Sequence, residues 1–370
     1  MKPPGDCWPT KQQELLLQAA LLEGPNAIAA WDEWKRGFEE NVRRRDSYRL
    51  LPLVYRSLKA LGIQGHELEQ LKRVYKLIWY RNRMQFHAVT PLLERLHRSG
   101  IRTMLLKGSS LVILYYGDLG VRTMTDTDIL VREKDVREAM SLLSELGWNP
   151  FACRDRSLEE SMPIRYDVHF ENAHGQHIDL HWRPLSWYRQ VLVEEIWDRT
   201  EALDYGGVST EAPCPADQLS HILLHGVSWR ESCSVHWVAD AVTVVRSRAS
   251  SLDWDRLVEQ ARRGKFALTV RHALTYLRDA FGAPVPDGVL NRVSGLPVSW
   301  KERADFRMRT RSCPPSGVPH VLHIFCMECL RFTHNPDFSH TPLGFLRYFQ
   351  QRMGIRSLSE AFLTGARWAM

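Results

Sequence analysis

The stretch that decides the fold is MLLKGSSLVILYYGDLGVRTMTDTDILV, from Met104 to Val131. A short apolar run ends at a glycine and two serines, a second apolar run ends at Gly117, and Asp126 and Asp128 follow with one residue between them. Residues two apart in a strand share a face. If TDTDILV is a strand, both carboxylates point to one place, where like charges repel. Such a pair requires a compensating positive charge.

A divalent cation is the compensating charge that this pattern favours. Magnesium prefers oxygen ligands and is commonly held by one or two carboxylates together with substrate phosphates. The apolar residues that follow Asp128, from Ile129 to Val131, would anchor the strand in the core and leave its acidic end exposed. Asp126 and Asp128 are therefore the first two predicted metal ligands.

The glycine–serine step supplies the other half of a phosphate site. Gly108 lets the backbone approach a ligand closely, and a helix that begins at Ser109 or Ser110 would direct its free N–H groups at an anion. Lys107 adds a cation beside this turn. A strand, a glycine–serine turn, a helix and a strand with Asp-x-Asp form the order of elements that metal-dependent nucleotidyl transfer requires.

A site with two metal ions needs a third carboxylate. The segment QHIDLHW predicts a neighbouring strand in which Asp179 lies on the opposite face from Ile178 and Leu180. Asp167, in the preceding predicted strand, is the competing candidate. Because the sequence around Asp167 is less apolar, Asp179 ranks first.

The sequence around this segment divides into three regions. Residues 1–99 carry apolar side chains at three- and four-residue spacing, which predicts an N-terminal helical region. Residues 100–204 alternate short apolar runs with brief helical patterns, and helical patterns return over residues 205–370. The predicted fold class is α+β, with a small mixed sheet as the core and helical regions on either side of it in the sequence.

Composition limits the function classes. The 370 residues are 44% hydrophobic and 25% charged, which is typical of a globular protein. The net charge of +6 favours polyanionic ligands such as nucleotides, and a nucleic acid partner is permitted but not indicated. The cluster Arg43–Arg45 is interpreted as a solvated helix end. Neither a membrane span nor an apolar signal segment is found, so a cytoplasmic location is expected.

The stretch LLKGSSLVILYYGDLGVRTMTDTDILV resembles the core motif of the bacterial nucleotidyltransferase-like family of the DNA polymerase β superfamily. HIDLHWRP resembles the strand that carries that family's third carboxylate, and the similarity extends over most of residues 50–360. The resemblance implies a polymerase β-like core in which Gly108 and Ser109 contact a triphosphate. Lys107 and Arg122 match basic positions of the motif. Arg122 has a second interpretation, as a structural ion pair with Asp118 or Asp126.

The same resemblance implies that Asp126, Asp128 and Asp179 bind two Mg²⁺ ions and are the catalytic residues. The expected reaction moves a nucleoside monophosphate from a nucleoside triphosphate, expected to be ATP, to the hydroxyl or phosphate of a small-molecule, peptide or protein acceptor, with release of pyrophosphate. Two departures from the superfamily pattern leave the acceptor open: the gap before Asp126 is longer than usual, and Thr127 replaces an apolar residue.

Two other functions fit the motif. A metal-dependent glycosyltransferase also uses Asp-x-Asp, although such enzymes place a longer strand–helix unit before it than the helical residues 1–99 provide. A nucleotide-binding or regulatory module in a biosynthetic complex would keep the fold without turnover. The presence of all three acids favours the enzyme.

Overall fold

The computed structural model describes residues 7–38, 45–151, 162–185, 190–228, 235–312, 317–335 and 338–353. Arg43 and Arg44, and residues 354–370 of the expected C-terminal helical region, lie outside this set. The described chain combines helices with one mixed sheet, so the predicted α+β class is confirmed. No helix of the described residues is both long and apolar enough to cross a membrane.

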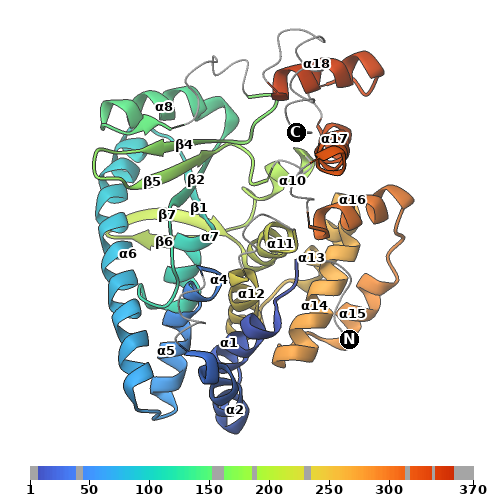
Figure 1. Ribbon diagram of the computed structural model, residues 1–370. Helices are drawn as coiled ribbons and strands as arrows, with labels where there is room; N and C mark the ends of the chain where they lie inside the picture. Colours follow the sequence, from blue (N-terminus) through green and yellow to red (C-terminus); the bar gives the residue numbers. More distant parts are fainter. Residues whose placement is uncertain are drawn as a thin grey trace.

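Helices precede the sheet in the sequence. The bounds are α1 Lys11–Leu21, α2 Gly24–Trp34, the 3₁₀ turn η1 Lys35–Gly37, α4 Arg45–Tyr48, α5 Leu51–Ala60 and α6 His66–Arg98. Thr10 and Gln13 form a reciprocal capping box that satisfies free N–H groups at the start of α1. The 33 residues of α6 make a helix about 50 Å long, which extends alongside the sheet (Figure 1).

The sheet has seven strands in the order β3-β4-β5-β2-β1-β7-β6. Their bounds are β1 Thr103–Leu106, β2 Thr127–Val131, β3 Asn149–Pro150, β4 Asp167–Glu171, β5 His177–His181, β6 Thr200–Tyr205 and β7 Val208–Pro213. The β2–β5 and β1–β7 pairs are parallel, and the other pairs are antiparallel. The sheet extends past the expected boundary at residue 204, because β7 pairs with β1.

Short helical segments connect the central strands. Between β1 and β2 lie α7 Lys107–Leu111 and the π-helical turn η2 Val112–Tyr116, and between β2 and β3 lie the 3₁₀ turn η3 Glu133–Asp135 and α8 Val136–Glu145. Gly117 ends η2 in the left-handed conformation with φ of 64°, which a glycine adopts without steric cost. The helix expected after Gly108 is therefore present and ends at the glycine that the sequence indicates.

The two faces of the sheet have different cover. Leu105, Ile129 and Leu180 pack in a core with the apolar sides of α6 and α8. Leu106 and Leu130 belong to a separate cluster on the opposite face. Because side chains alternate along a strand, the even-numbered positions of β2 and the odd-numbered positions of β5 point away from α6.

The remaining helices form a second core and, at the C-terminal end, a separate small cluster of Ile164, Phe332 and Tyr348. They are α10 Gln190–Glu195, α11 Pro215–Gly226, α12 His236–Ser247, α13 Trp254–Gly264, α14 Ala267–Phe281, α15 Asp287–Ser294, α16 Trp300–Thr310, α17 Gly317–His334 and α18 Pro342–Met353. Leu16 and Trp34 from the N-terminal helices share this core with Val242, Leu274 and Phe306 from the C-terminal half. The helices expected as separate N-terminal and C-terminal regions therefore pack together, with α1 against α12 (Figure 1).

Candidate active site

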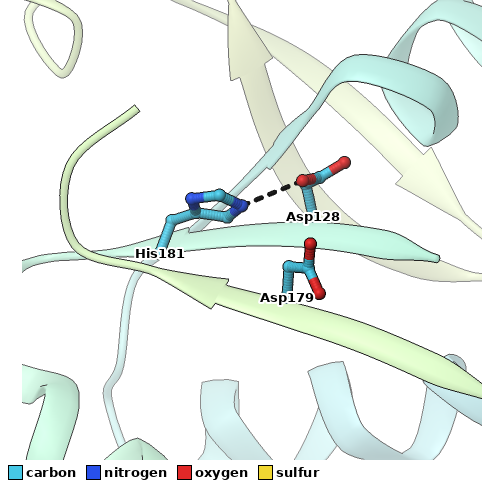
Figure 2. Close-up of side chains that lie close together, drawn as sticks. All are labelled: Asp128, Asp179 and His181. Atoms are coloured by element: carbon cyan, nitrogen blue, oxygen red, sulfur yellow. Dashed lines mark hydrogen bonds and ion pairs between the residues drawn. The ribbon is translucent and has the colours of Figure 1, made fainter. Parts of the chain in front are cut away.

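Strand register brings two of the predicted acids together. Asp128 of β2 is the direct parallel neighbour of Asp179 of β5. Figure 2 shows their carboxylates on adjacent strands, with His181 close by. Asp126 lies just before β2 and lines the same cavity as the other two acids. All three therefore lie on the sheet face that α6 does not cover.

The surroundings of Asp126 and Asp128 shift the pKa values of these two acids in opposite directions. Burial, together with the charges of Asp128 and Asp179, raises the pKa of Asp126 to about 6. Burial alone would also raise the pKa of Asp128, but the Lys107 ammonium and the hydrogen bond from His181 hold it well below its usual value. The Lys107 Nζ lies 2.5 Å from Asp128 Oδ1. The cation that the Asp-x-Asp pattern requires is thus supplied in part by the chain itself.

Two histidines hold the acids in place. His181 Nε2 lies 2.9 Å from Asp128 Oδ1, and His169 Nδ1 lies 2.5 Å from Asp179 Oδ1. An ionised carboxylate only accepts hydrogen bonds, so each of these ring nitrogens carries the proton. The bond to Asp179 raises the pKa of the His169 imidazole. His181 therefore bonds to Asp128 on the neighbouring strand rather than to Asp179 on its own strand.

Asp167, the competing third acid, lies on β4. Its register partner is His181, and its Oδ2 is 4.0 Å from His169 Nε2. Asp179 lines the cavity and Asp167 does not. The position of Asp167 one strand further out offers a matched acid for control experiments.

Close packing explains why residue 108 is a glycine. A Cβ on Gly108 would lie 2.7 Å from Arg122 Nη1 and 3.0 Å from Met124 Cγ, so a larger residue would displace the loop that leads to Asp126. Lys107 beside it has a φ of 49°, in the left-handed region that non-glycine residues seldom adopt. Strain of this kind is common at functional sites. The turn therefore brings Lys107, the start of α7 and Arg122 close together.

Arg122 forms a buried ion pair with a distant residue. Its Nε and Nη2 donate to the two carboxylate oxygens of Asp240 at 2.8 and 2.9 Å, and the Tyr116 hydroxyl donates to the same carboxylate at 2.9 Å. Asp118, the suggested alternative partner, accepts from the Tyr75 hydroxyl and the Gly120 N–H. The structural ion pair expected for Arg122 is therefore present, but its partner is Asp240 rather than Asp118 or Asp126.

Ser109 differs in position from the other predicted residues. It is 1% exposed, its Oγ lies 3.9 Å from Met124 Sδ, and it does not line the cavity, whereas Lys107, Gly108 and Arg122 do. A contact between Ser109 and a ligand in the cavity would therefore involve its backbone N–H rather than its hydroxyl.

These groups surround a cavity of about 380 Å³, large enough for a nucleotide. The sheet and α7 supply one group of lining residues, and α11 and α12 supply another. Among the cavity's arginines and lysines, Lys107 pairs with Asp128 and Arg122 pairs with Asp240. Arg49 also lines the cavity and has no ion-pair partner among the described residues. Among the described lining residues, Arg49 is therefore a cation that can bind an anion without loss of an ion pair.

The sequence analysis did not identify Arg49 or His221. His221, on α11, is 2% exposed, lines the cavity and has no described partner for Nε2. Burial, reinforced by the charge of Lys107, lowers the pKa of His221 to about 3, so its imidazole is neutral near pH 7. Neither residue lies in a motif. Their contribution depends on helices far from Asp126 in the sequence, and no local pattern indicates it.

A family model described as uncharacterised nucleotidyltransferase matches residues 35–282, which include every candidate site residue. The chain belongs to this nucleotidyltransferase family. The resemblance noted from the sequence is therefore confirmed at the level of a nucleotidyltransferase family. No curated protein gives a significant match.

Solved structures provide two further likenesses to this member of the nucleotidyltransferase family. One is the crystal structure of an antigenic nucleotidyltransferase-like protein from Paracoccidioides brasiliensis, with 13% identity and a TM-score of 0.38 over 56% of this chain and 95% of that chain. Another is a tRNA-processing enzyme in an apo form, with 14% identity and a TM-score of 0.22 over 74% of this chain and 72% of that chain.

The donor set fits a divalent metal ion. Ligand atoms of Asp128, Asp179 and His181 all lie within 4.8 Å of one another. Because His181 Nε2 donates to Asp128, the carboxylates are the available ligands, and carboxylate oxygens are what Mg²⁺ prefers. Burial is the main reason that the pKa of Asp126 is raised, and the charges of Asp128 and Asp179, which a bound cation would neutralise, add to it.

Proposed function

We propose that this protein is a Mg²⁺-dependent nucleotidyltransferase that moves a nucleoside monophosphate from a nucleoside triphosphate to an acceptor hydroxyl or phosphate. The observation that carries the proposal is the register of Asp128 against Asp179, at the wall of a cavity that also contains cationic side chains. Membership of a nucleotidyltransferase family supports it.

Asp126, Asp128 and Asp179 are the proposed metal ligands, with room in the donor set for two ions. Bound Mg²⁺ would lower the pKa of the acceptor and stabilise the charge that develops on the phosphate. His181 and His169 fix the orientation of two of these carboxylates through the hydrogen bonds described above. Substitution of either histidine would therefore affect the metal site without removal of a ligand.

The proposed triphosphate contacts come from the cationic wall of the cavity. Arg49 has no ion-pair partner within the described parts of the chain, and Lys107 is a point charge next to the acids. Gly108 lets Arg122 and Met124 pack against the start of α7, and Ser109 offers its backbone N–H. Arg122 acts mainly by fixing the loop before Asp126, because its guanidinium is already paired with Asp240. ATP is the proposed donor.

In the proposed reaction the acceptor oxygen forms a bond to the α-phosphorus and the bond to the bridging oxygen breaks. Pyrophosphate leaves, and the acceptor proton passes to a carboxylate or to water. The acceptor class stays open among small molecules, peptides and proteins. It would approach from the side formed by α11 and α12, where His221 and His225 line the cavity.

The test is transfer of radiolabel from each α-³²P nucleoside triphosphate to components of a cell extract, with Mg²⁺ present. The wild-type protein should produce a labelled acceptor and an equivalent amount of pyrophosphate. Asp128→Asn and Asp179→Asn should remove this transfer, whereas Asp167→Asn, the matched acid on β4, should retain most of it. Transfer at the wild-type rate by Asp128→Asn would contradict the proposal, and tight nucleotide binding without any product would favour the regulatory alternative.

A further inference from the structure

The outer face of α6 is strongly basic. Between Gln70 and Leu93 the sequence has five lysines and arginines and no acidic residue, compared with a net charge of +6 for the whole chain. The five are Lys72, Arg73, Lys76, Arg81 and Arg83. We propose that this face, from Arg73 to His87, binds single-stranded nucleic acid.

The cations on this face are available to a ligand. Arg73, Lys76, Arg81 and Arg83 are exposed, and no ion pair joins any of them to another described residue. By contrast, the exposed Arg98 pairs with Glu94, and the exposed Arg102 pairs with Glu211. Unpaired cations on one side of a helix form the electrostatic footprint expected for a polyanion.

Aromatic side chains lie among these cations. Tyr80 is 58% exposed and Trp79 is 43% exposed, and each is large enough to stack on a base. Helical geometry places Arg73, Lys76, Tyr80 and Arg83 on one stripe, since they follow one another at three- or four-residue spacing. The stripe from Arg73 to His87 is about 21 Å long. Cations that follow a phosphate backbone, with aromatic rings between them, are typical of proteins that bind single strands.

The apolar side of α6 argues against a membrane partner. A helix that lies in a membrane surface needs a free apolar face to bury among the lipids. On α6 that face is already occupied, because Ile78, Val89 and Leu92 are buried within the protein. The exposed apolar side chains of α6, which are Leu77, Trp79, Tyr80 and Met84, are interspersed with the exposed cations of the helix. Charge complementarity and stacking together therefore favour a nucleic acid strand.

This surface is separate from the candidate active site. The opposite side of α6 packs on the sheet face that Ile129 and Leu180 share, and the acids point away from that face. In Figure 1 the helix lies along one edge of the molecule, on the far side of the sheet from α11 and α12. Failure of nucleotidyl transfer would therefore leave this proposal unaffected, and the reverse also holds.

Fluorescence anisotropy with labelled oligouridylate and oligothymidylate tests the proposal. Oligonucleotides of about 20 nucleotides are longer than a typical single-strand binding site of about 4–16 nucleotides. Four phosphate contacts predict a slope of log affinity against log salt of about −2.8, which is a loss of about 50-fold between 50 and 200 mM salt. The variant Arg73→Gln/Lys76→Gln/Arg83→Gln should reduce that loss to about threefold. A matched triple variant with exposed lysines replaced elsewhere, Lys59→Gln/Lys134→Gln/Lys301→Gln, should keep the wild-type slope.

A second pair of variants tests stacking. Tyr80→Ala should weaken binding about fivefold or more, whereas Tyr80→Phe, which keeps the ring, should bind like the wild type. Because Tyr80 is exposed, neither change removes core packing, and circular dichroism checks the fold. The proposal is overturned if the α6 triple variant binds as tightly as the control, or if Tyr80→Ala has no effect. Equal α6-dependent binding of polyglutamate or of anionic vesicles would also overturn it.

Discussion

The Arg122–Asp240 pair makes the sharpest stability prediction. Arg122→Met would leave the Asp240 carboxylate, 5% exposed, with only the Tyr116 hydroxyl as a described donor. Removal of one partner of a buried pair leaves an uncompensated charge and costs about 3–5 kcal/mol. Because domains are typically stable by about 5–15 kcal/mol, this loss is a large part of the total.

Urea denaturation followed by circular dichroism measures the effect. The single variants Arg122→Met and Asp240→Asn should each lower the urea midpoint strongly. The loss of unfolding free energy in Arg122→Met/Asp240→Asn should be about 2 kcal/mol smaller than the sum of the two single losses. Asparagine keeps an acceptor for Tyr116, so the double variant isolates the charge pair. A loss below about 1 kcal/mol in Arg122→Met, the value of an exposed pair, would refute this reasoning.

Three further predictions concern the cavity. Gly108→Ala should weaken binding of a non-hydrolysable ATP analogue, because its Cβ would lie 2.7 Å from Arg122 Nη1; calorimetry that shows unchanged affinity would count against the close packing. Arg49→Gln should weaken the same binding by about 10- to 100-fold, the value of a charged hydrogen bond, whereas the exposed Lys59→Gln should have no effect. His221→Phe should slow transfer while His221→Gln, which keeps a polar side chain, retains more activity, and equal rates in the two variants would exclude a hydrogen bond from His221.

The local geometry of the acids could be predicted from the sequence. A period of two places Asp126 and Asp128 on one side of a strand, and the same rule separates Asp179 from Ile178 and Leu180. The structure confirms this alternation, because Ile178 and Leu180 pack in the core beneath α6 whereas Asp179 lines the cavity on the other face. These conclusions need only the neighbours of each residue, which is why one sequence is enough to reach them.

The partners of these residues could not be predicted in the same way. Arg122 pairs with Asp240, which lies 118 positions away in the sequence. No described hydrogen bond joins Arg122 to the nearby acids Asp118 and Asp126, and Asp118 accepts from Tyr75 instead. The hydroxyl of Ser109 faces Met124 because α7 starts at Lys107 and the serine falls on its buried side. Both outcomes depend on how α7 and α12 pack. The spacing of neighbouring residues does not indicate how elements far apart in the sequence pack.

The basic face of α6 is hard to detect in the sequence. Its cations are dispersed among apolar residues at helical spacing, so no run of like charges attracts notice, as Arg43–Arg45 does. Only the folded helix sorts Ile78 to the inside and Lys76 and Tyr80 to the outside. Surface charge therefore has to be assessed by helical face rather than by sequence runs.

We propose above that Asp126, Asp128 and Asp179 together hold the metal ions that bring a nucleotide into the cavity. Calorimetry with α,β-methylene-ATP tests it most directly, with Mg²⁺ or with EDTA, in the wild type, Asp128→Asn and Asp167→Asn. We predict Mg²⁺-dependent binding in the wild type and in Asp167→Asn, and none in Asp128→Asn. Equal binding by all three proteins in EDTA would contradict the claim.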